Sequence, residues 1–295
     1  MEEHPNSEKS KNEKNFYILG DARVLNTKAP AIFSSIMKKA GIKGSYEPFV
    51  ITPGKLGDAV KEIRLMNVAG ANVTIPYKES IIPYLDDLSE GATIIGSINT
   101  IVTTGNKLKG YNTNAIGFMD ALKDADMDIA GKSVLVFGTG GAARAVVFIL
   151  NWVRANPILI TGRNQGKINA ITKQIGGEAI SLKALPDRPL AIDLLVNATS
   201  VSSPGESPEL AALVQQLQLP NCEMVIDLNY GRSRNFWQEM AQSKGIPFMD
   251  GLSSLANQAK RTFSLWTGID IKHEDVLSAI QDASAVALYP ILPST

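Results

Sequence analysis

A short glycine-rich segment carries the clearest chemical signal in this sequence. The apolar run Val134–Phe137 leads directly into Gly138 and Gly140, and a helical pattern begins at Gly141 and includes Ala143. In such a Gly-x-Gly-x-x-Ala turn, the first glycine permits the tight turn, the second lets the backbone approach a pyrophosphate, and the small third residue allows close helix–strand packing. The N–H groups and positive dipole at the helix start favour phosphate. The segment predicts dinucleotide binding, with a purely structural turn as the alternative.

The residues after the next predicted strand indicate which dinucleotide is bound. NAD-specific sites of this type carry Asp or Glu about 20 residues beyond the glycines, where the carboxylate binds the ribose 2′-hydroxyl. Here the strand ends at Thr161, Gly162 and Arg163 follow, and Lys167 lies one turn further on. An arginine binds a 2′-phosphate through charge-assisted, bidentate hydrogen bonds. We therefore predict NADP as the cofactor; the alternative is an ordinary solvated arginine.

Strands that alternate with helices must position these residues. Such alternation is typical of βαβ units and predicts an α/β protein with two α/β domains. The predicted strands are Phe16–Gly20, Tyr46–Ile51, Gly70–Thr74, Thr100–Thr103, Val134–Phe137, Pro157–Thr161, Asp193–Asn197 and Met224–Leu228. The predicted helices are Pro30–Ala40, Leu56–Met66, Pro76 to Gly91, Asn114 to Ala125, Gly141–Val153 and Gly251 to Trp266, and the segment Tyr289–Thr295 is expected to be irregular.

Composition excludes several classes of protein. The 295 residues carry 29 basic and 29 acidic side chains, so the charge that drives non-specific nucleic-acid binding is missing and no nucleic acid is expected as a partner. A single cysteine, Cys222, and two histidines argue against a disulfide, a cysteine-rich metal site or a histidine cluster, so no metal is predicted. No apolar run is long enough to span a bilayer. The polar residues 1–14 are expected to be a disordered tail and no secretory signal, so we expect a cytoplasmic protein without membrane contact.

Seven motifs, in the same order along the chain, make the sequence resemble the shikimate dehydrogenase family, which includes quinate/shikimate dehydrogenases and their paralogues. The resemblance covers about residues 16–270. The motifs are Gly70–Lys78 (GANVTIPYK), Gly96–Thr100 (GSINT), Gly110–Gly117 (GYNTNAIG), Gly138–Arg144 together with Arg163, Asp193–Ser200, Asp227–Tyr230 and Asp250–Gln258.

The resemblance implies a domain organisation and a reaction. A substrate-binding domain would comprise residues 15–113 and 252–295, and a Rossmann-type NADP-binding domain residues 114–251, facing it across a cleft. The reaction would be reversible hydride transfer between NADP(H) and 3-dehydroshikimate or shikimate, in the biosynthesis of aromatic amino acids. The substrate class is a small cyclic hydroxy acid, and the fold is known both as a monomer and as a homodimer.

The resemblance also assigns roles to individual residues. Lys78 would be the catalytic lysine at the reacting hydroxyl, and Asn114 stands where the family has its catalytic aspartate. A lysine in a closing cleft loses water, which lowers its pKa and suits it to proton transfer. The expected substrate-binding residues are Thr27, Thr74, Asn99, Tyr230 and Gln258. The expected cofactor-binding residues are Gly138, Gly140, Gly141, Ala142, Arg144, Arg163, Lys167, Thr199, Leu228 and Gly251.

Three departures from the family pattern concern residues expected near the substrate and the nicotinamide. Asn114 replaces the aspartate, and Thr27-Lys-Ala29 replaces the Ser-x-Ser pair that reads the substrate carboxylate, so that Ala29 offers no hydroxyl. Ser254 and Ser202 stand where the family has methionine and glycine. The glycine-rich cofactor loop, by contrast, is intact.

Three hypotheses about function follow from this pattern. The first is a shikimate or quinate-type dehydrogenase that tolerates the changes. The second is a paralogue that uses NADP on another polyhydroxy or amino-substituted cyclic acid, such as quinate or aminoshikimate. The third is a non-catalytic NADP-binding sensor. The sensor, which has no need of a positioned lysine, is disfavoured by Lys78, Thr74, Asn99 and Gln258.

Overall fold

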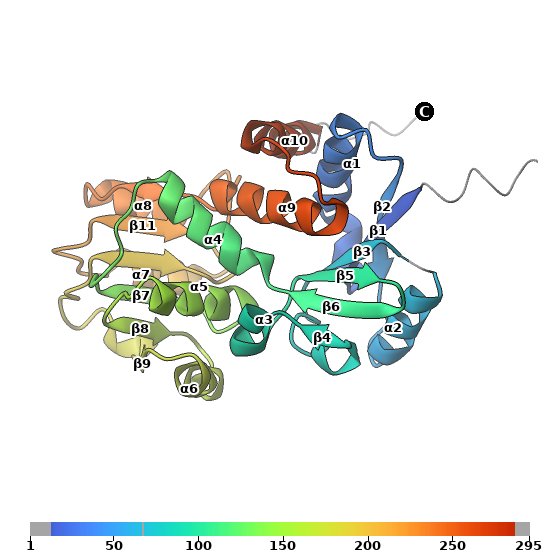
Figure 1. Ribbon diagram of the computed structural model, residues 1–295. Coiled ribbons are helices and arrows are strands. Elements are labelled where there is room, and N and C mark those ends of the chain that lie inside the picture. The colour runs from blue at the N-terminus through green and yellow to red at the C-terminus, as the bar shows by residue number, and fades with distance from the viewer. Residues whose placement is uncertain (1–12, 67, 287–295) are drawn as a thin grey trace, which may run out of the picture. The chain divides into compact units, whose positions relative to one another are not determined.

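The computed structural model describes residues 13–66 and 68–286 and divides into two compact units (Figure 1). Unit 1 comprises the chain up to Ala92, then Ile98–Thr113, then the chain from Ala259 onward. Unit 2 comprises Thr93–Ser97 and Asn114–Gln258. The predicted tail and the predicted irregular segment after Tyr289 lie outside the described residues, except for residues 13 and 14.

Unit 1 contains a mixed six-stranded sheet in the order β2-β1-β3-β5-β6-β4. Its strands are β1 (Lys14–Gly20), β2 (Gly44–Val50), β3 (Gly70–Val73), β4 (Asp87–Leu88), β5 (Thr100–Thr104) and β6 (Lys107–Tyr111). β1 runs parallel to β2 and β3, whereas β5 runs antiparallel to β3 and β6. The carboxyl ends of β1, β3 and β6 and the amino end of β5 therefore meet at one edge of this sheet.

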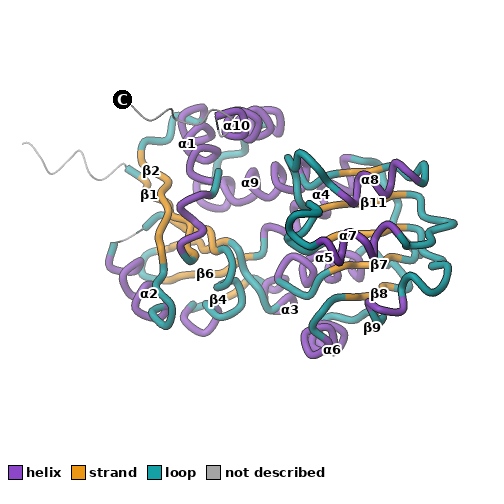
Figure 2. Tube along the Cα trace, turned by 180° about the vertical axis from the view of Figure 1, so that it is seen from behind, coloured by secondary structure: helices purple, strands orange, loops and turns teal. Residues whose placement is uncertain are grey.

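Helices and aromatic side chains complete the core of unit 1. The helices are α1 (Ala29–Lys39), α2 (Leu56–Leu65), the later turns of α9 (Leu252–Thr267) and α10 (His273–Val286), with 3-10 helices η1 (Ala22–Asn26) and η2 (Ile82–Tyr84). Trp266 of α9 stacks on Phe16 of β1 with ring centroids 4.7 Å apart, and its indole N–H donates to the Ile101 carbonyl. Both views show α10 beside α1 (Figures 1 and 2), which ties residues far apart in sequence into one core.

Unit 2 contains a parallel six-stranded sheet in the order β12-β11-β10-β7-β8-β9. Its strands are β7 (Val134–Phe137), β8 (Ile158–Thr161), β9 (Glu178–Ala179), β10 (Leu194–Asn197), β11 (Met224–Asp227) and β12 (Phe248–Met249). Numbered from β7, the order is that of the doubly wound dinucleotide-binding fold, in which the strand order reverses next to the first strand. Ligands of such sheets bind outside the carboxyl ends of the strands at this reversal.

Helices cover both faces of the unit 2 sheet. They are the second half of α3 (Glu90–Ile95), α4 (Thr113–Asp124) after its first residue, α5 (Gly141–Trp152), α6 (Gln165–Gln174), α7 (Pro208–Gln215), α8 (Phe236–Ser243) and the first turns of α9, with the 3-10 helix η3 (Leu182–Ala184). Val134 and Val136 of β7 face one apolar cluster, and Leu135 and Phe137 face another. Burial on both faces explains why these strands are continuous apolar runs.

The structure confirms the predicted α/β class and corrects several predicted elements. The helix predicted from Pro76 to Gly91 is wrong, since this segment contains turns, η2 and β4, and Pro83 within it has no N–H to continue a helix. The expected tail is too long, because the Lys14 N–H donates to the Lys43 carbonyl at the start of β1. α10 was not predicted. Among the described residues, no helix is both long and apolar enough to cross a membrane.

The division between the units falls inside a helix. The predicted domain boundary at residue 252 is the start of α9, whereas the division lies between Gln258 and Ala259. The first turns of α9 pack on α4 within unit 2, where the Asn257 amide donates to Asp124 at 2.8 Å. The later turns carry Trp266 into the core of unit 1. A single amphipathic helix gives no sign in the sequence of where its partners change.

Candidate active site

In unit 1, four predicted site residues lie just outside strand ends at one edge of the sheet. Thr27 lies beyond β1, Thr74 and Lys78 follow β3, and Asn99 immediately precedes β5. The Thr74 N–H donates to the Leu19 carbonyl at 2.9 Å, which fixes Thr74 against the end of β1. Gly20 is needed for this approach, because a Cβ there would lie 2.7 Å from the Thr74 methyl group.

Asn99 is held by the residue that starts α4. Its Oδ1 accepts from the Thr113 N–H at 2.7 Å, and its Nδ2 donates to the Thr113 hydroxyl at 2.9 Å. Asn99 is 4% exposed, and Thr113 is fully buried. These two bonds set the direction of the carboxamide, so the orientation of Asn99 depends on the start of α4 as well as on β5.

A triangle of buried threonine hydroxyls lies behind Asn99. Thr100 of β5, Thr113 of α4 and Thr262 of α9 are joined by contacts of 2.9 to 3.1 Å between their hydroxyl oxygens. Asn72 of β3 donates to Thr100 and accepts from the buried Tyr46 hydroxyl. This network was not predicted from the sequence. The sequence offered one signal for it: Thr100, Thr113 and Thr262 are polar residues in elements that also contain apolar core residues.

Lys78 has an altered acid–base character. Its side chain is partly buried, and burial lowers the pKa of Lys78 to about 8 because the ammonium form loses water. The carbonyl of the same residue accepts from the Ile98 N–H at 2.8 Å, which fixes the backbone beside the start of β5. An amine with this pKa exchanges a proton near neutral pH, as a general acid–base group requires.

Thr27 keeps a hydroxyl at the start of α1. Its Oγ1 accepts from the Ala29 N–H at 3.3 Å, so the hydroxyl is oriented by the first turn of the helix. The neighbouring Lys28 side chain donates to Ser284 of α10 at 3.1 Å. Of the pair of positions that reads a carboxylate in the family pattern, Thr27 therefore offers a side-chain donor and Ala29 none.

In unit 2, the glycine-rich loop has the conformation that its sequence predicts. Gly138 has φ +127°, and a Cβ there would lie 2.8 Å from the Ala198 carbonyl oxygen after β10. Gly140 caps α5 without a side-chain hydrogen bond, and a Cβ there would meet nothing within 4 Å. Gly141 and Ala142 form the first turn of α5, which contains no acidic residue. The helix start therefore presents backbone N–H groups at the strand reversal, as a pyrophosphate site requires.

The loop after β8 supplies two exposed cations. Arg163 and Lys167 are both exposed, and Asn164 caps α6 by accepting from the Lys167 N–H at 3.0 Å. Gly162 lies against the glycine-rich loop, since a Cβ there would be 2.9 Å from the Thr139 methyl group. The segment from Gly162 to Lys167 contains no carboxylate. This arrangement suits a 2′-phosphate next to the dinucleotide loop.

Arg144, also expected at the cofactor, lies inside unit 2. It is 7% exposed; its Nε donates to the Ile95 carbonyl at the end of α3 at 2.5 Å, and its Nη2 donates to Gln174 of α6. These bonds join α3 to α6 and neutralise part of the negative end of α3. The structure thus gives Arg144 a supporting role that its place in the motif did not indicate, and its contact with the cofactor stays a prediction.

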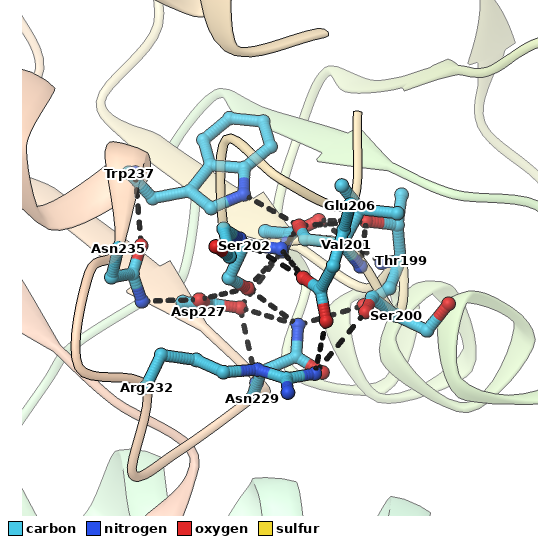
Figure 3. Close-up of polar contacts among 12 residues, drawn as sticks. Thr199, Ser200, Val201, Ser202, Glu206, Asp227, Asn229, Arg232, Asn235 and Trp237 are labelled. Carbon is cyan, nitrogen blue, oxygen red and sulfur yellow. Dashed lines mark hydrogen bonds and ion pairs between the residues drawn. The ribbon is translucent and has the colours of Figure 1, made fainter. Parts of the chain in front are cut away.

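A buried carboxylate organises the ends of β10 and β11 (Figure 3). Asp227 is fully buried and accepts five hydrogen bonds. Its Oδ1 accepts from the Asn197 side chain at 2.8 Å and from the Asn229 backbone and side chain, and its Oδ2 accepts from Ser202 at 2.6 Å and from Asn235 at 2.7 Å. The hub joins two strands, the loops that follow them and the start of α8. The motifs contain Asn197 and Asp227, but their joint role was missed.

Thr199 has its hydrogen-bonding groups turned into this hub. Its N–H and its hydroxyl donate to Asn197 Oδ1 at 3.0 and 2.7 Å, and its carbonyl accepts from Asn229. Leu228 lies beneath Gly251, where a Cβ would be 2.1 Å from the Leu228 carbonyl oxygen. A side chain at 251 is therefore excluded, and the predicted contact of Gly251 with the cofactor stays a prediction.

The remaining predicted residues lie on separate elements of unit 2. Tyr230 is partly exposed on the loop after β11, and burial raises the pKa of its hydroxyl. Asn114 lies in the first turn of α4, and Gln258 lies on α9. Gly117 allows α4 and α9 to pack closely, because a Cβ there would be 2.5 Å from the Ser254 carbonyl oxygen and 2.7 Å from Gln258 Cβ. Within residues 13–66 and 68–286, no cluster of His, Cys, Asp and Glu could hold a metal ion.

Two family models match most of the chain. Residues 19–101 match the shikimate dehydrogenase substrate binding domain, and residues 120–248 match shikimate / quinate 5-dehydrogenase.

Individual proteins show the same likeness. A protein of Caldanaerobacter subterraneus named shikimate dehydrogenase (NADP(+)) is 36% identical over 83% of this chain and 89% of its own length. The Bacillus subtilis protein of the same name is 34% identical over 85% of this chain and 91% of its own length. The crystal structure of shikimate 5-dehydrogenase from Thermus thermophilus in complex with NADP(H) and shikimate superposes with a TM-score of 0.79, at 32% identity, over 92% of this chain and 99% of that chain.

Proposed function

Because the chain belongs to the shikimate dehydrogenase family, we propose that it catalyses reversible hydride transfer between shikimate and NADP⁺, giving 3-dehydroshikimate and NADPH. The observation that carries the proposal is Lys78, a partly buried lysine of pKa about 8 in the motif that matches the family. The relatives' common name favours shikimate over the other cyclic acids and over a non-catalytic sensor.

Unit 2 has the features that an NADP site needs. The pyrophosphate would lie at the start of α5, over Gly138, Gly140 and Gly141, where no side chain obstructs the N–H groups. Arg163 and Lys167 would hold the 2′-phosphate. Thr199, Leu228 and Gly251 would line the nicotinamide. NADP⁺, when bound, supplies a ring that accepts a hydride.

Unit 1 would bind the substrate and move its proton. We assign the substrate hydroxyls to Thr74 and Asn99, and the carboxylate to Thr27. The family motifs also assign Tyr230 and Gln258 to the substrate. During oxidation, the neutral Nζ of Lys78 takes the proton of the reacting hydroxyl, and during reduction the ammonium form returns it. Asn99 suits the binding of a hydroxyl, because Thr113 fixes the direction of its carboxamide.

A panel of cyclic acids with NADP⁺ or NAD⁺, followed by absorbance at 340 nm, tests the proposal directly. We expect reduction of NADP⁺ with shikimate as the preferred substrate. Preference for quinate or an amino-substituted acid would show a different substrate. Binding of NADP⁺ without turnover of any acid would refute the proposed activity.

The cofactor preference is expected to depend on Arg163. Arg163→Ala removes the charge that pairs with the 2′-phosphate, so the affinity for NADP⁺ should fall about ten- to a hundredfold while that for NAD⁺ changes little. Titration calorimetry with both cofactors measures the difference. Arg188→Ala removes an exposed arginine elsewhere in unit 2 and serves as the control. Equal losses for the two cofactors would show that Arg163 does not bind the phosphate.

The asparagine at 114 is expected to limit turnover. An amide binds a hydroxyl but holds neither a negative charge nor an exchangeable proton for catalysis, and acid–base assistance contributes about 10²–10⁴ in rate. Asn114→Asp should therefore raise kcat for shikimate at least about tenfold, with little change in NADP⁺ affinity. The double variant with Lys78→Met should stay inactive. An aspartate variant no faster than the natural protein would show that Asn114 suits a different substrate.

A further inference from the structure

Two loops at the carboxyl edge of the unit 2 sheet are joined at their bases. Residues 199–206 follow β10 and residues 228–235 follow β11. At the base, Asn229 Nδ2 donates to the Thr199 carbonyl at 2.9 Å and to the Ser202 hydroxyl at 2.8 Å, and Ser202 in turn donates to Asp227. Ser202 is fully buried. The serine at the family's glycine position thus adds a bond between the loops.

The same loops are joined a second time by Glu206 of the first loop and Arg232 of the second (Figure 3). Glu206 Oε2 accepts from the Ser202 and Ser203 N–H groups at 2.9 and 3.0 Å, and its Oε1 pairs with Arg232 Nη2 at 2.9 Å. The same Nη2 lies 3.5 Å from the Ser200 carbonyl oxygen. The Glu206 and Arg232 side chains are 32% and 38% exposed, so the pair is only partly screened by water.

Tyr230 lies between the two points of attachment. Asn229, which precedes it, donates to Asp227, and Arg232, two residues after it, pairs with Glu206. Only Gly231, with φ +65°, separates Tyr230 from Arg232. Glycine has more backbone freedom than any other residue, so the attachments at both ends restrict the conformations of this short stretch.

We propose that the Glu206–Arg232 ion pair is a clasp that positions Tyr230 for substrate binding, with Glu206 and Arg232 as positioning residues. The inference rests on the proposed function for the identity of the molecule that Tyr230 touches. The clasp follows β10 and β11, whereas Arg163 follows β8, on the other side of β7 in the strand order. Its loss should therefore weaken substrate binding without weakening the binding of the 2′-phosphate.

Charge-neutralising variants test the clasp through KM. In Glu206→Gln the carbonyl oxygen still accepts from the Ser202 and Ser203 N–H groups, but the ion pair is lost. We expect a KM for shikimate about three- to tenfold higher, with kcat and the KM for NADP⁺ within about twofold of the natural protein. Arg232→Gln should raise the KM for shikimate by a similar factor, and the double variant should raise it no further than either single variant. Arg232→Lys keeps the charge, so its KM should lie close to that of the natural protein.

A second ion pair of the same sheet provides a matched control. Lys132 and Glu223 pair at 2.5 Å before β7 and β11, at the amino edge of the sheet, where their side chains are 31% and 59% exposed. Glu223→Gln should leave all three kinetic constants unchanged. The clasp is overturned if Glu206→Gln behaves like Glu223→Gln, or if the effects of the two single variants multiply in the double variant.

Amide hydrogen exchange of the protein without ligands separates the clasp from the proposed function. Glu206→Gln should speed exchange in residues 200–206 and 230–235, whereas Thr199 and Leu228, whose N–H groups are bonded to Asn197, should keep their exchange rates. Glu223→Gln should not speed exchange in either loop. Unchanged exchange in these loops overturns the clasp even in an active enzyme. If the natural protein fails to oxidise shikimate but exchange in the loops rises, the clasp stands and the proposed function falls.

Discussion

Lys78→Met is expected to lower kcat for shikimate oxidation by about 10²–10⁴, because it removes the amine proposed to accept the hydroxyl proton and keeps a side chain of similar length. Affinity for NADP⁺ should change little, since the residues proposed to bind the cofactor lie in unit 2. Lys61→Met replaces a lysine of α2 that is 80% exposed and should leave the rate unchanged. A methionine variant that retained more than a tenth of the activity would exclude Lys78 as the proton-transfer group.

The same lysine fixes the sign of the pH dependence. Oxidation needs the neutral amine, so its rate should rise with pH and level off above the pKa of about 8. Reduction needs the ammonium form, so its rate should be constant at low pH and fall above about 8. Rates in both directions, measured from pH 6 to 10 in the natural protein, test this. Parallel curves in the two directions would contradict the assignment.

Asp227→Ala is expected to lower the free energy of unfolding by about 3–5 kcal/mol. The substitution leaves buried donors of Asn197, Ser202 and Asn235 without their acceptor, and each such group costs about 1–3 kcal/mol. Asp227→Asn should lower the free energy of unfolding by less than Asp227→Ala does. Its amide oxygen still accepts hydrogen bonds, but its new NH₂ group faces donors. Urea unfolding, followed by tryptophan fluorescence, measures the loss, and Trp237 donates to the Val201 carbonyl within the same network.

An exposed aspartate of the same unit provides the control for this stability experiment. Asp187→Ala should change the free energy of unfolding by less than about 0.5 kcal/mol. A loss below about 1 kcal/mol for Asp227→Ala would show that the loops re-form their hydrogen bonds with water or with each other. The buried carboxylate would then contribute little to holding β10, β11 and α8 together.

The sequence was sufficient for features that depend on local geometry. Val134–Phe137 is a strand buried on both faces, and Gly138 has the positive φ that its place in the turn requires. The alternation of strands and helices correctly indicated the α/β class. These features depend on residues near one another in the chain, so a short window of sequence contains the information.

Features that depend on distant residues could not be read in this way. Arg144 stands in a phosphate-loop motif, but its guanidinium bonds to α3 and α6, which only the folded chain brings together. The Thr100–Thr113–Thr262 contacts join three elements, and no periodicity links them. In the segment after Pro76, polar and apolar residues alternate with a spacing that suits a helix. Tertiary contacts and Pro83 nevertheless give this segment turns.

The discontinuous make-up of unit 1 has a consequence for the order in which the chain matures on the ribosome. Its six strands are synthesised before the main segment of unit 2, residues 114–258, but α10 and the later turns of α9 are synthesised after that segment. The strands of unit 1 therefore leave the ribosome before Trp266, which stacks on Phe16, has been synthesised. Residues 114–258 can complete their own sheet in the meantime. The part of the protein that is translated first is thus the last to close, and its unsatisfied apolar face is the surface that a chaperone would meet.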